Sequence, residues 1–180
     1  MALIGENRMV EGVDMLRHSA AALVITFVAV TSGSHASATP LTVAGYDAQW
    51  CGQSAYPTIQ AGDVAQMSTC FANTGTVSWT NGTATEVALA VCVDTPAPQY
   101  FACNVLSPYA DWAQNWVSQR IYASAALQVV SVGGTSFFTF NVKAPAGTPS
   151  GDYYFRGELV LRANGALIHP VGFYMRVHVI

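Results

Sequence analysis

The sequence predicts an all-β fold, arranged as a two-sheet antiparallel sandwich of about seven to nine strands. From residue 46 to the C-terminus, apolar side chains alternate with polar ones or form short runs, and no segment has a sustained helical period. Turn-forming residues separate these runs, most densely in the segment 144–151 (APAGTPSG). Aromatic residues recur at positions that the alternation directs to one face of a strand, as the space between two packed sheets requires.

The N-terminal part of the chain is predicted to lie outside this fold. Arg17 precedes a short apolar run at 20–30, and small residues follow as far as Ala38. A basic start, a hydrophobic stretch and small residues before a cleavage site are typical of a signal peptide, here over residues 1–38, with 1–14 as a superfluous start. The alternative is a retained membrane anchor, but the run is shorter than the about 20 apolar residues that a bilayer span needs.

The exported part, 39–180, is expected to form a single domain that is secreted or held in the cell envelope. Charged residues make up 9% of the chain, and the formal net charge is −3. This balance provides no basic surface for nucleic acid. We therefore expect no nucleic-acid partner and no membrane span after cleavage of the signal peptide.

All cysteines of the sequence lie in the exported part, at Cys51, Cys70, Cys92 and Cys103. An even number of cysteines in an oxidising compartment indicates disulfides, although four cysteines allow three connectivities. A structural zinc site would need closely spaced pairs such as Cys-x-x-Cys, and that spacing is absent. The sequence therefore predicts two disulfides and no metal site.

A predicted hairpin over 47–73 selects one of these connectivities. In its register Trp50 lies opposite Phe71, and the next pair is Cys51 and Cys70. Alternation sends the aromatic pair to the core and the cysteine pair to the outer face. Cys51 is therefore expected to bond Cys70, and by elimination the two remaining cysteines bond each other.

Further strands are predicted over 84–93, 120–131 and 135–143. In the last of these, alternating apolar residues share one face, while 104–119 is the least regular part of the chain. The residues assigned to the core are Trp50, Phe71, Trp79, Phe138, Phe140 and Tyr153.

A second hairpin is predicted at the C-terminus. Asn164-Gly165 is typical of a type I′ turn between two strands. Pairing around that turn sets Phe155 opposite Tyr174, one residue out of phase with the apolar faces, so a bulge is expected near 170–172. Glu158 is expected on the outward face of this hairpin.

Seven short segments in order carry a resemblance to a known family. They are 45–50 (GYDAQW), 54–59 (SAYPTI), 61–63 (AGD), 73–79 (NTGTVSW), 116–120 (WVSQR), 138–145 (FTFNVKAP) and 151–153 (GDY). Together they resemble the four-tryptophan immunoglobulin-like domain, known from selective-autophagy receptors and common in exported bacterial proteins. The resemblance covers nearly all of 45–180 and implies an immunoglobulin-like sandwich that serves as an adhesive or scaffolding module. The chain departs from the family in having no tryptophan in its final hairpin.

The irregular segment contains the candidate binding residues. Tyr109, Asp111, Trp112 and Trp116 lie close together, with Arg120 after them, and aromatic faces beside polar side chains suit sugar rings or protein partners. The alternative is a lid over one end of the sandwich, because the two tryptophans are four residues apart and one helical turn would direct both to the core. Arg120 is expected either to stack on Trp116 or to flank the next strand.

Catalytic residues are not evident. The exported part contains two histidines, His169 and His178, and neither has a nucleophile or acid close to it in the sequence. We therefore expect a binding module with no enzyme activity and no cofactor, whose partner is a protein or a glycan at the cell surface. The carbohydrate-binding alternative would use Tyr109 and Trp112, and a secreted hydrolase is the remaining alternative.

Overall fold

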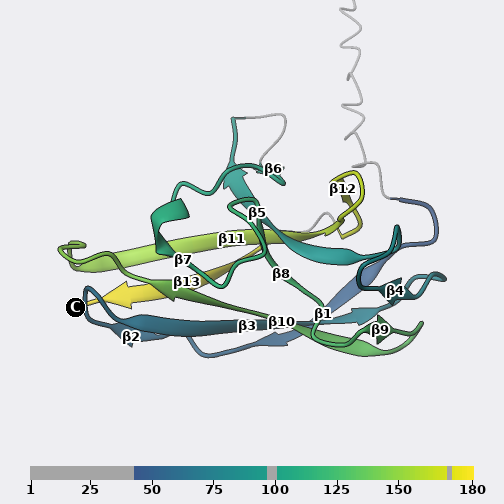
Figure 1. Cartoon of the computed structure of the whole chain (residues 1–180), viewed down its shortest axis with the longest axis horizontal. Helices are drawn as coiled ribbons and strands as arrows, with labels where there is room; N and C mark the ends of the chain where they lie inside the picture. Colours follow the sequence, from purple (N-terminus) through teal and green to yellow (C-terminus); the bar gives the residue numbers. More distant parts are fainter. Residues whose placement is uncertain (1–42, 97–100, 170–171) are drawn as a thin grey trace, which may run out of the picture. The chain divides into compact units, whose positions relative to one another are not determined.

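A computed structural model describes residues 43–96, 101–169 and 172–180. It confirms the predicted fold class, an all-β immunoglobulin-like sandwich in which two main sheets face each other (Figure 1). The predicted signal peptide, 1–38, lies outside the described residues. Among the described residues, no helix is long and apolar enough to cross a membrane.

Two sheets supply the layers of the sandwich. The four-stranded sheet has the order β1 (Ala48–Gln53), β3 (Val64–Asn73), β10 (Thr135–Lys143) and β7 (Ala113–Gln114). The seven-stranded sheet has the order β2 (Thr58–Ile59), β13 (Phe173–Val179), β11 (Gly151–Leu161), β5 (Val87–Asp94) and β6 (Phe101–Cys103). In that sheet β12 (Ala166–Leu167) also pairs with β11, and β8 (Ile121–Ser124) pairs with β5. A small separate pair joins β4 (Trp79–Thr80) to β9 (Val129–Val130).

The strands agree with the sequence except in one segment. The predicted strand 135–143 coincides with β10, and 47–54 and 64–73 agree with β1 and β3. The segment 120–131 was expected to be one strand but is divided into β8 and β9, because its two ends pair with different strands.

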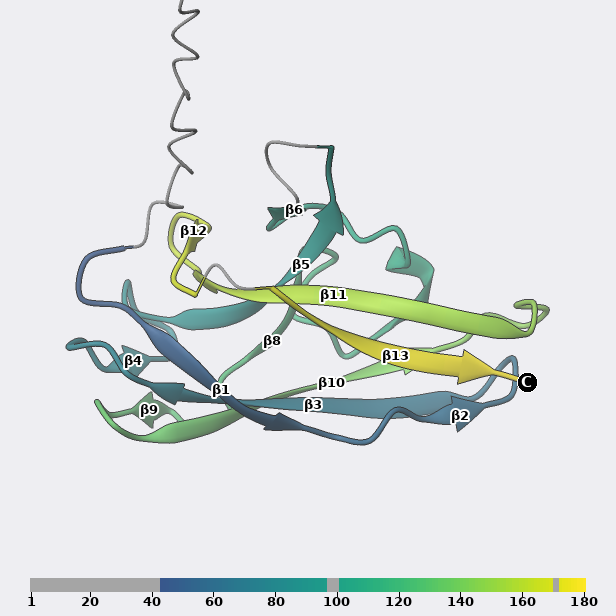
Figure 2. The same ribbon diagram turned by 180° about the vertical axis from the view of Figure 1, so that it is seen from behind.

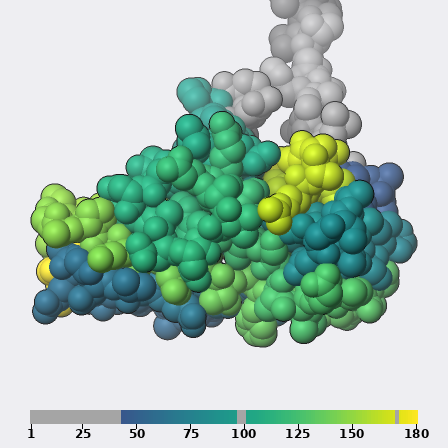
Figure 3. All heavy atoms as spheres, viewed as in Figure 1, coloured from purple at the N-terminus to yellow at the C-terminus, as the bar shows by residue number. Residues whose placement is uncertain are grey.

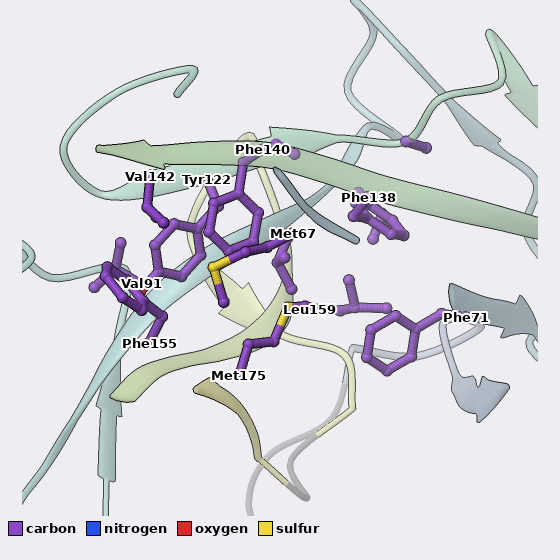
Figure 4. Packing of buried hydrophobic residues seen from close by; sticks show 14 of the residues in the cluster. Met67, Phe71, Val91, Tyr122, Phe138, Phe140, Val142, Phe155, Leu159 and Met175 are labelled. Carbon is purple, nitrogen blue, oxygen red and sulfur yellow. The ribbon is translucent and has the colours of Figure 1, made fainter. Parts of the chain in front are cut away.

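The core between the sheets is rich in aromatic and sulfur-containing side chains (Figure 4). Trp79, Phe71 and Phe138 are fully buried, as expected, and Tyr153 packs against the core while half-buried. The rings of Phe71 and Phe138 meet edge to face with centroids 6.0 Å apart, which is a favourable geometry for aromatic pairs.

Trp50 does not lie in the core, and the expectation for it is wrong. It pairs with Phe71, so its side chain does point to the inner face of the four-stranded sheet. However, β1 is the outermost strand of that sheet, and the Trp50 side chain remains 48% exposed. The inner face of an edge strand is buried only where the opposite sheet extends over it.

The Asn73-Thr-Gly75 turn is held by a buried amide. The Asn73 side chain donates hydrogen bonds to the carbonyl oxygens of Val77 (2.9 Å) and Val130 (3.1 Å) and accepts one from the Gly75 amide (3.1 Å). A Cβ atom at Gly75 would lie 2.5 Å from the carbonyl oxygen of Gly45, which leaves no room for a larger residue. This turn joins β3 to β4 and fixes Trp79 in the core.

Both predicted disulfides are confirmed. Cys51 bonds Cys70 with a Cα–Cα distance of 5.1 Å, and Cys92 bonds Cys103 across paired strands with a Cα–Cα distance of 4.0 Å. The register at the first bridge differs slightly from the expectation, because Gly52 pairs with Cys70 and Cys51 occupies a bulge.

The C-terminal hairpin confirms the expected irregularity but not the expected turn. Leu161 pairs with Ala166, so the loop has four residues and only Gly165 of the Asn164-Gly165 pair has a positive φ. The Asn164 side chain accepts a hydrogen bond from the Ala166 amide (3.0 Å), which stabilises this longer turn in place of type I′.

A break in pairing follows this hairpin. Val160 pairs with Leu167 but Gly157 pairs with Phe173, so β11 advances by three residues while its partner advances by six. Phe155 then pairs in phase with Met175, as the bulge was expected to achieve. Part of the predicted bulge, residues 170 and 171, lies outside the described residues.

A candidate binding groove at the open side of the sandwich

The aromatic patch predicted from the sequence is largely buried. Trp112 is the last residue of the 3₁₀ helix η1 (Ala110–Trp112), and its side chain is 3% exposed. The centroid of its ring lies 4.7 Å from that of Tyr153 and 5.6 Å from that of Phe155. Tyr109 is half-buried against the same rings, while Asp111 is exposed. Burial of Trp112 leaves no exposed ring face for a sugar at that position, and the segment packs as a lid over this part of the sandwich, which was the expected alternative. Figure 3 shows the segment from about 101 to 130 as a continuous cover over this side.

Trp116 belongs to the same lid. It is half-buried, its indole Nε1 donates a hydrogen bond to the carbonyl oxygen of Asn141 (2.7 Å), and its ring meets Tyr122 edge to face at 4.6 Å. Arg120 instead donates to the carbonyl oxygen of Asn104 (2.9 Å), and the described residues show no stacking of Arg120 on Trp116. Trp116 is therefore part of the packing of the lid, while Arg120 remains exposed beside it.

An open cavity of about 430 Å³ lies elsewhere, between the edge strand β1 and the beginning of β13. Both strands run along the same side of the sandwich (Figure 2). The residues that line the cavity are Trp50, Gln53, Tyr56, Phe71, His169, Gly172, Phe173 and Tyr174. We call this cavity and its rim the aromatic groove.

Exposed tyrosines form the rim of the groove. Tyr56 stacks on Tyr174 with centroids 6.2 Å apart, and Tyr154 meets Tyr174 edge to face at 5.5 Å. The guanidinium carbons of Arg176 and Arg156 lie 5.2 and 5.8 Å from the ring centres of Tyr56 and Tyr174. These contacts hold the rim in one arrangement while leaving all three tyrosines exposed.

The charges around the groove are balanced. Arg156 forms an ion pair with Asp94 (2.9 Å), and Arg176 forms one with Asp152 (3.3 Å), which also contacts His178 (2.8 Å). All of these side chains are at least one-third exposed, so the pairs contribute little to stability. Their effect is to leave the rim without a strong net charge.

A buried carboxylate contacts two of the residues that line the groove. Strand alternation keeps Glu158 on the face of β11 opposite Leu159, as expected, but its side chain is completely buried. Its carboxylate accepts hydrogen bonds from the backbone amides of Leu159 (2.7 Å) and Gly172 and lies 3.2 Å from His169 Nδ1. The carboxylate is buried because the break in strand pairing leaves amides here without a backbone acceptor, and the carboxylate supplies one.

His169 connects this carboxylate to the cavity. Because a carboxylate only accepts hydrogen bonds, Nδ1 carries a proton that it donates to Glu158. This hydrogen bond raises the pKa of His169, partial burial opposes the rise, and the charges of Glu158 and Asp47 add to it. The ring also lies edge-on to Phe71 at 5.6 Å and lines the cavity.

The groove offers binding surface and few groups for chemistry. Its lining residues include no serine, threonine or cysteine that His169 could activate. Both oxygens of Glu158 already accept hydrogen bonds from the backbone. Within the described part of the chain, no group of three or more His, Cys, Asp or Glu residues is placed to hold a metal ion.

The sequence contained a partial indication of this groove. Strand alternation places Tyr154 and Tyr174 on the outward face of the C-terminal strands, opposite the apolar core residues. Two aromatic residues on a solvent face are unusual enough to indicate a surface site. The contribution of Tyr56 and His169 was not predictable, because both reach the groove from segments without regular pairing beside it.

Comparisons with known proteins give only structural similarities. No known family model matches the chain, and no curated protein is similar to it in sequence. Among solved structures, it is similar to the CARDB domain of the PF1109 protein from Pyrococcus furiosus, solved in complex with di-metal ions. That similarity has 11% identity and a TM-score of 0.43, and it covers 79% of this chain and 95% of that domain. A structure of AvmM, described as catalysing macrocyclization in alchivemycin A biosynthesis, is similar at 9% identity and a TM-score of 0.34, over 78% of this chain and 96% of that one. Neither similarity is close enough to transfer a function.

Proposed function

We propose that this protein is an exported immunoglobulin-like module that binds a protein partner through the aromatic groove and catalyses no reaction. The observation that carries the proposal is a cavity of about 430 Å³ beside a half-exposed Trp50. Ligand sites are concave and mostly apolar with a few polar groups, and tryptophan and tyrosine are enriched among residues that dominate protein interfaces. The groove has both properties, with Gln53 and His169 as its polar groups.

Export is supported by two independent features. The first is the order of basic, apolar and small residues in the segment 1–38. The second is the pair of disulfides, which persist in oxidising compartments. The resemblance to the four-tryptophan immunoglobulin-like domain is part of this proposal and agrees with an adhesive or scaffolding role.

A protein partner suits the groove better than a glycan. Sugar rings stack on free aromatic faces, but the faces of Tyr56 and Tyr174 are already used by each other and by arginine side chains. The remaining lining is mostly apolar, with few groups to bond sugar hydroxyls. Catalysis is disfavoured because His169 has no nucleophile among the residues that line the cavity.

Site-specific photo-crosslinking tests the proposal. We would place a photoreactive phenylalanine analogue at Gln53, expose the protein to an envelope fraction, and compare the backgrounds Trp50→Ala and Phe137→Ala. Phe137 is a matched control, because it is 54% exposed and lies on β10, away from the groove. We expect a protein adduct that Trp50→Ala removes and Phe137→Ala preserves.

Two outcomes would overturn the proposal. One is an adduct of equal yield in both backgrounds, which would show that contact with the partner does not depend on the groove. The other is the absence of protein adducts together with binding on a glycan array that Trp50→Ala abolishes. That second result would establish the carbohydrate-binding alternative at a new position.

A further inference from the structure

We infer that the occupant of the aromatic groove is an extended peptide segment, which adds as a strand to the free edge of β13 and places an apolar side chain over Phe71. This inference rests on the proposed function and specifies the form of the protein partner. The argument depends on three features: the unpaired edge of β13, the protected edge of β1, and the neutral apolar lining of the cavity.

The first half of β13 has an open edge. On one side β13 pairs with β11 along its whole length, but on the other side β2 covers only His178 and Val179. The amide of His178 donates to the carbonyl oxygen of Pro57 (2.9 Å), so the backbone groups of His178 point away from β11. Because these directions alternate along an antiparallel pair, the backbone groups of Tyr174 and Arg176 point the same way. No strand among the described residues pairs with them there.

The edge of β1, on the other side of the cavity from β13, is less available for pairing with a peptide. The Thr74 amide donates to the carbonyl oxygen of Asp47 (3.2 Å), so alternation directs the backbone groups of Ala48 and Trp50 away from β3. However, the Ala48 amide donates to the carboxylate of Asp47 (2.8 Å), and a charged side chain at this position protects an exposed strand edge. The available edge is therefore that of β13, and Trp50 forms the opposite wall.

The cavity lies next to this edge and suits a side chain of an added strand. Tyr174 belongs both to the open edge and to the cavity lining, and Phe71 lies at the buried side. When a peptide extends a sheet, main-chain hydrogen bonds provide affinity and pockets for alternate side chains provide specificity. An apolar or aromatic side chain would bury surface against Trp50, Phe71 and Phe173.

The polar groups near the cavity also suit a peptide backbone. His169 uses Nδ1 for Glu158, while Nε2 has no hydrogen-bond partner among the described residues. When the ring is neutral, Nε2 can accept a hydrogen bond from a backbone amide of the peptide, and when the ring is protonated it can donate one to a carbonyl oxygen. The arginines of the rim are already paired with Asp94 and Asp152, so the groove provides no free cationic site that would favour an acidic or phosphorylated ligand.

The first experiment identifies peptides. A phage-displayed library of random linear heptapeptides would be selected on the disulfide-bonded exported part of the chain, with counter-selection on the Trp50→Ala variant. We expect enrichment of sequences with one apolar anchor among β-prone residues, and we expect them to bind Phe137→Ala as well as the unchanged protein. If the groove takes no peptide, counter-selection on Trp50→Ala will remove every sequence that binds the unchanged protein, and the inference is wrong.

The second experiment tests strand addition directly. Each amide of the best synthetic peptide would be N-methylated in turn, and binding would be measured by calorimetry. Amides of an added strand point alternately toward and away from β13, so methylation at every second position should weaken binding by about tenfold and the intervening positions should have little effect.

A pair of variants at Tyr174 tests the main-chain hydrogen bond to the peptide from the side of the protein. Tyr174→Ala removes the ring and keeps the amide, whereas Tyr174→Pro removes both, and proline is tolerated where the strand amide faces outward. We expect the proline variant to bind the peptide about three- to tenfold more weakly than the alanine variant. If the proline variant does not fold, the alternating methylation pattern alone decides the question.

The results distinguish this inference from the proposed function. If photo-crosslinking depends on Trp50 but methylation has no alternating effect, the groove binds a protein in another form and the strand-addition inference is wrong. If neither the adduct nor the peptides depend on Trp50, the proposed function itself is wrong. A glycan array that is positive only with Trp50 present, without selected peptides, also overturns the inference.

Discussion

Two aromatic clusters in this molecule have similar composition and opposite exposure. The lid cluster, Tyr109, Trp112, Tyr153 and Phe155, is packed within the sandwich, and Trp112 is 3% exposed. The aromatic groove has Trp50, Tyr56 and Tyr174 at its surface. Tyr109 and Trp112 come from an irregular segment that resembles a binding loop, and they pack on Tyr153 and Phe155 of the strand β11. Trp50 comes from a regular strand with an inward-facing pattern.

This contrast shows that exposure depends on what covers a side chain. The irregular segment 104–119 folds back onto the sandwich and buries its rings against β11. Trp50 has the correct inward orientation on β1, but no strand of the opposite sheet covers that edge. Local pattern therefore determined the direction of Trp50 but left that of Trp112 open, and it determined the burial of neither.

The largest expected effect is loss of the lid anchor. Trp112→Ala should lower the free energy of unfolding by about 3–5 kcal/mol, because it removes a buried ring and leaves a cavity against Tyr153 and Phe155. Urea unfolding with the disulfides intact would measure the change. A loss below about 1 kcal/mol would contradict the burial of Trp112 and restore it as a surface residue.

Glu158, which contacts the groove residue His169, should be the next most sensitive point. Glu158→Ala leaves the amides of Leu159 and Gly172 without their acceptor, and it should cost about 2–4 kcal/mol of stability. Glu158→Gln keeps an acceptor oxygen and serves as the milder control. If both variants unfold at the same urea concentration as the unchanged protein, Glu158 does not support the break in the sheet.

The pH dependence of stability sharpens the same point. Because the pKa of His169 is raised in the folded state, its contribution is fully present below the unfolded pKa of about 6.5 and is lost as pH rises through the folded pKa. The loss occurs because neutral His169 no longer compensates the charge of buried Glu158. The unchanged protein should therefore lose more stability between pH 5.5 and pH 8.5 than His169→Gln.

Thermal unfolding across this pH range would measure the difference. Equal slopes for the two proteins would show that the His169–Glu158 contact is not coupled to protonation. A steeper loss of stability in His169→Gln would reverse the predicted sign.

The smallest effect on stability is expected at the rim of the groove. Trp50→Ala should change the free energy of unfolding by less than about 1 kcal/mol, because the side chain is 48% exposed and has no covering strand. Differential scanning calorimetry would compare it with Trp112→Ala under the same conditions. If Trp50→Ala were as damaging as Trp112→Ala, the contrast between the two clusters would not hold.

Much of the fold was predictable because its causes are local. The alternation of apolar and polar residues located β10 and the apolar faces of β11 and β13. The pairing register predicted for β1 and β3 correctly placed Phe71 opposite Trp50 and joined Cys51 to Cys70. The turn at Asn164-Gly165 was misjudged, because the Asn164 side chain stabilises a loop that the dipeptide preference does not specify. The burial of Trp112 was not predictable, because sequence spacing cannot report which surface another segment covers.

The sequence by itself determined the fold class, the strand faces, the disulfides and the inward direction of most aromatic side chains, since each follows from a period of two and from cysteine chemistry. Only the tertiary structure decided that the lid buries Trp112, that Trp50 stays open to solvent, and that Glu158 is buried beside His169. Those outcomes depend on how far each sheet extends over the other and where strand pairing breaks. Both are set by contacts between segments that are distant in the chain.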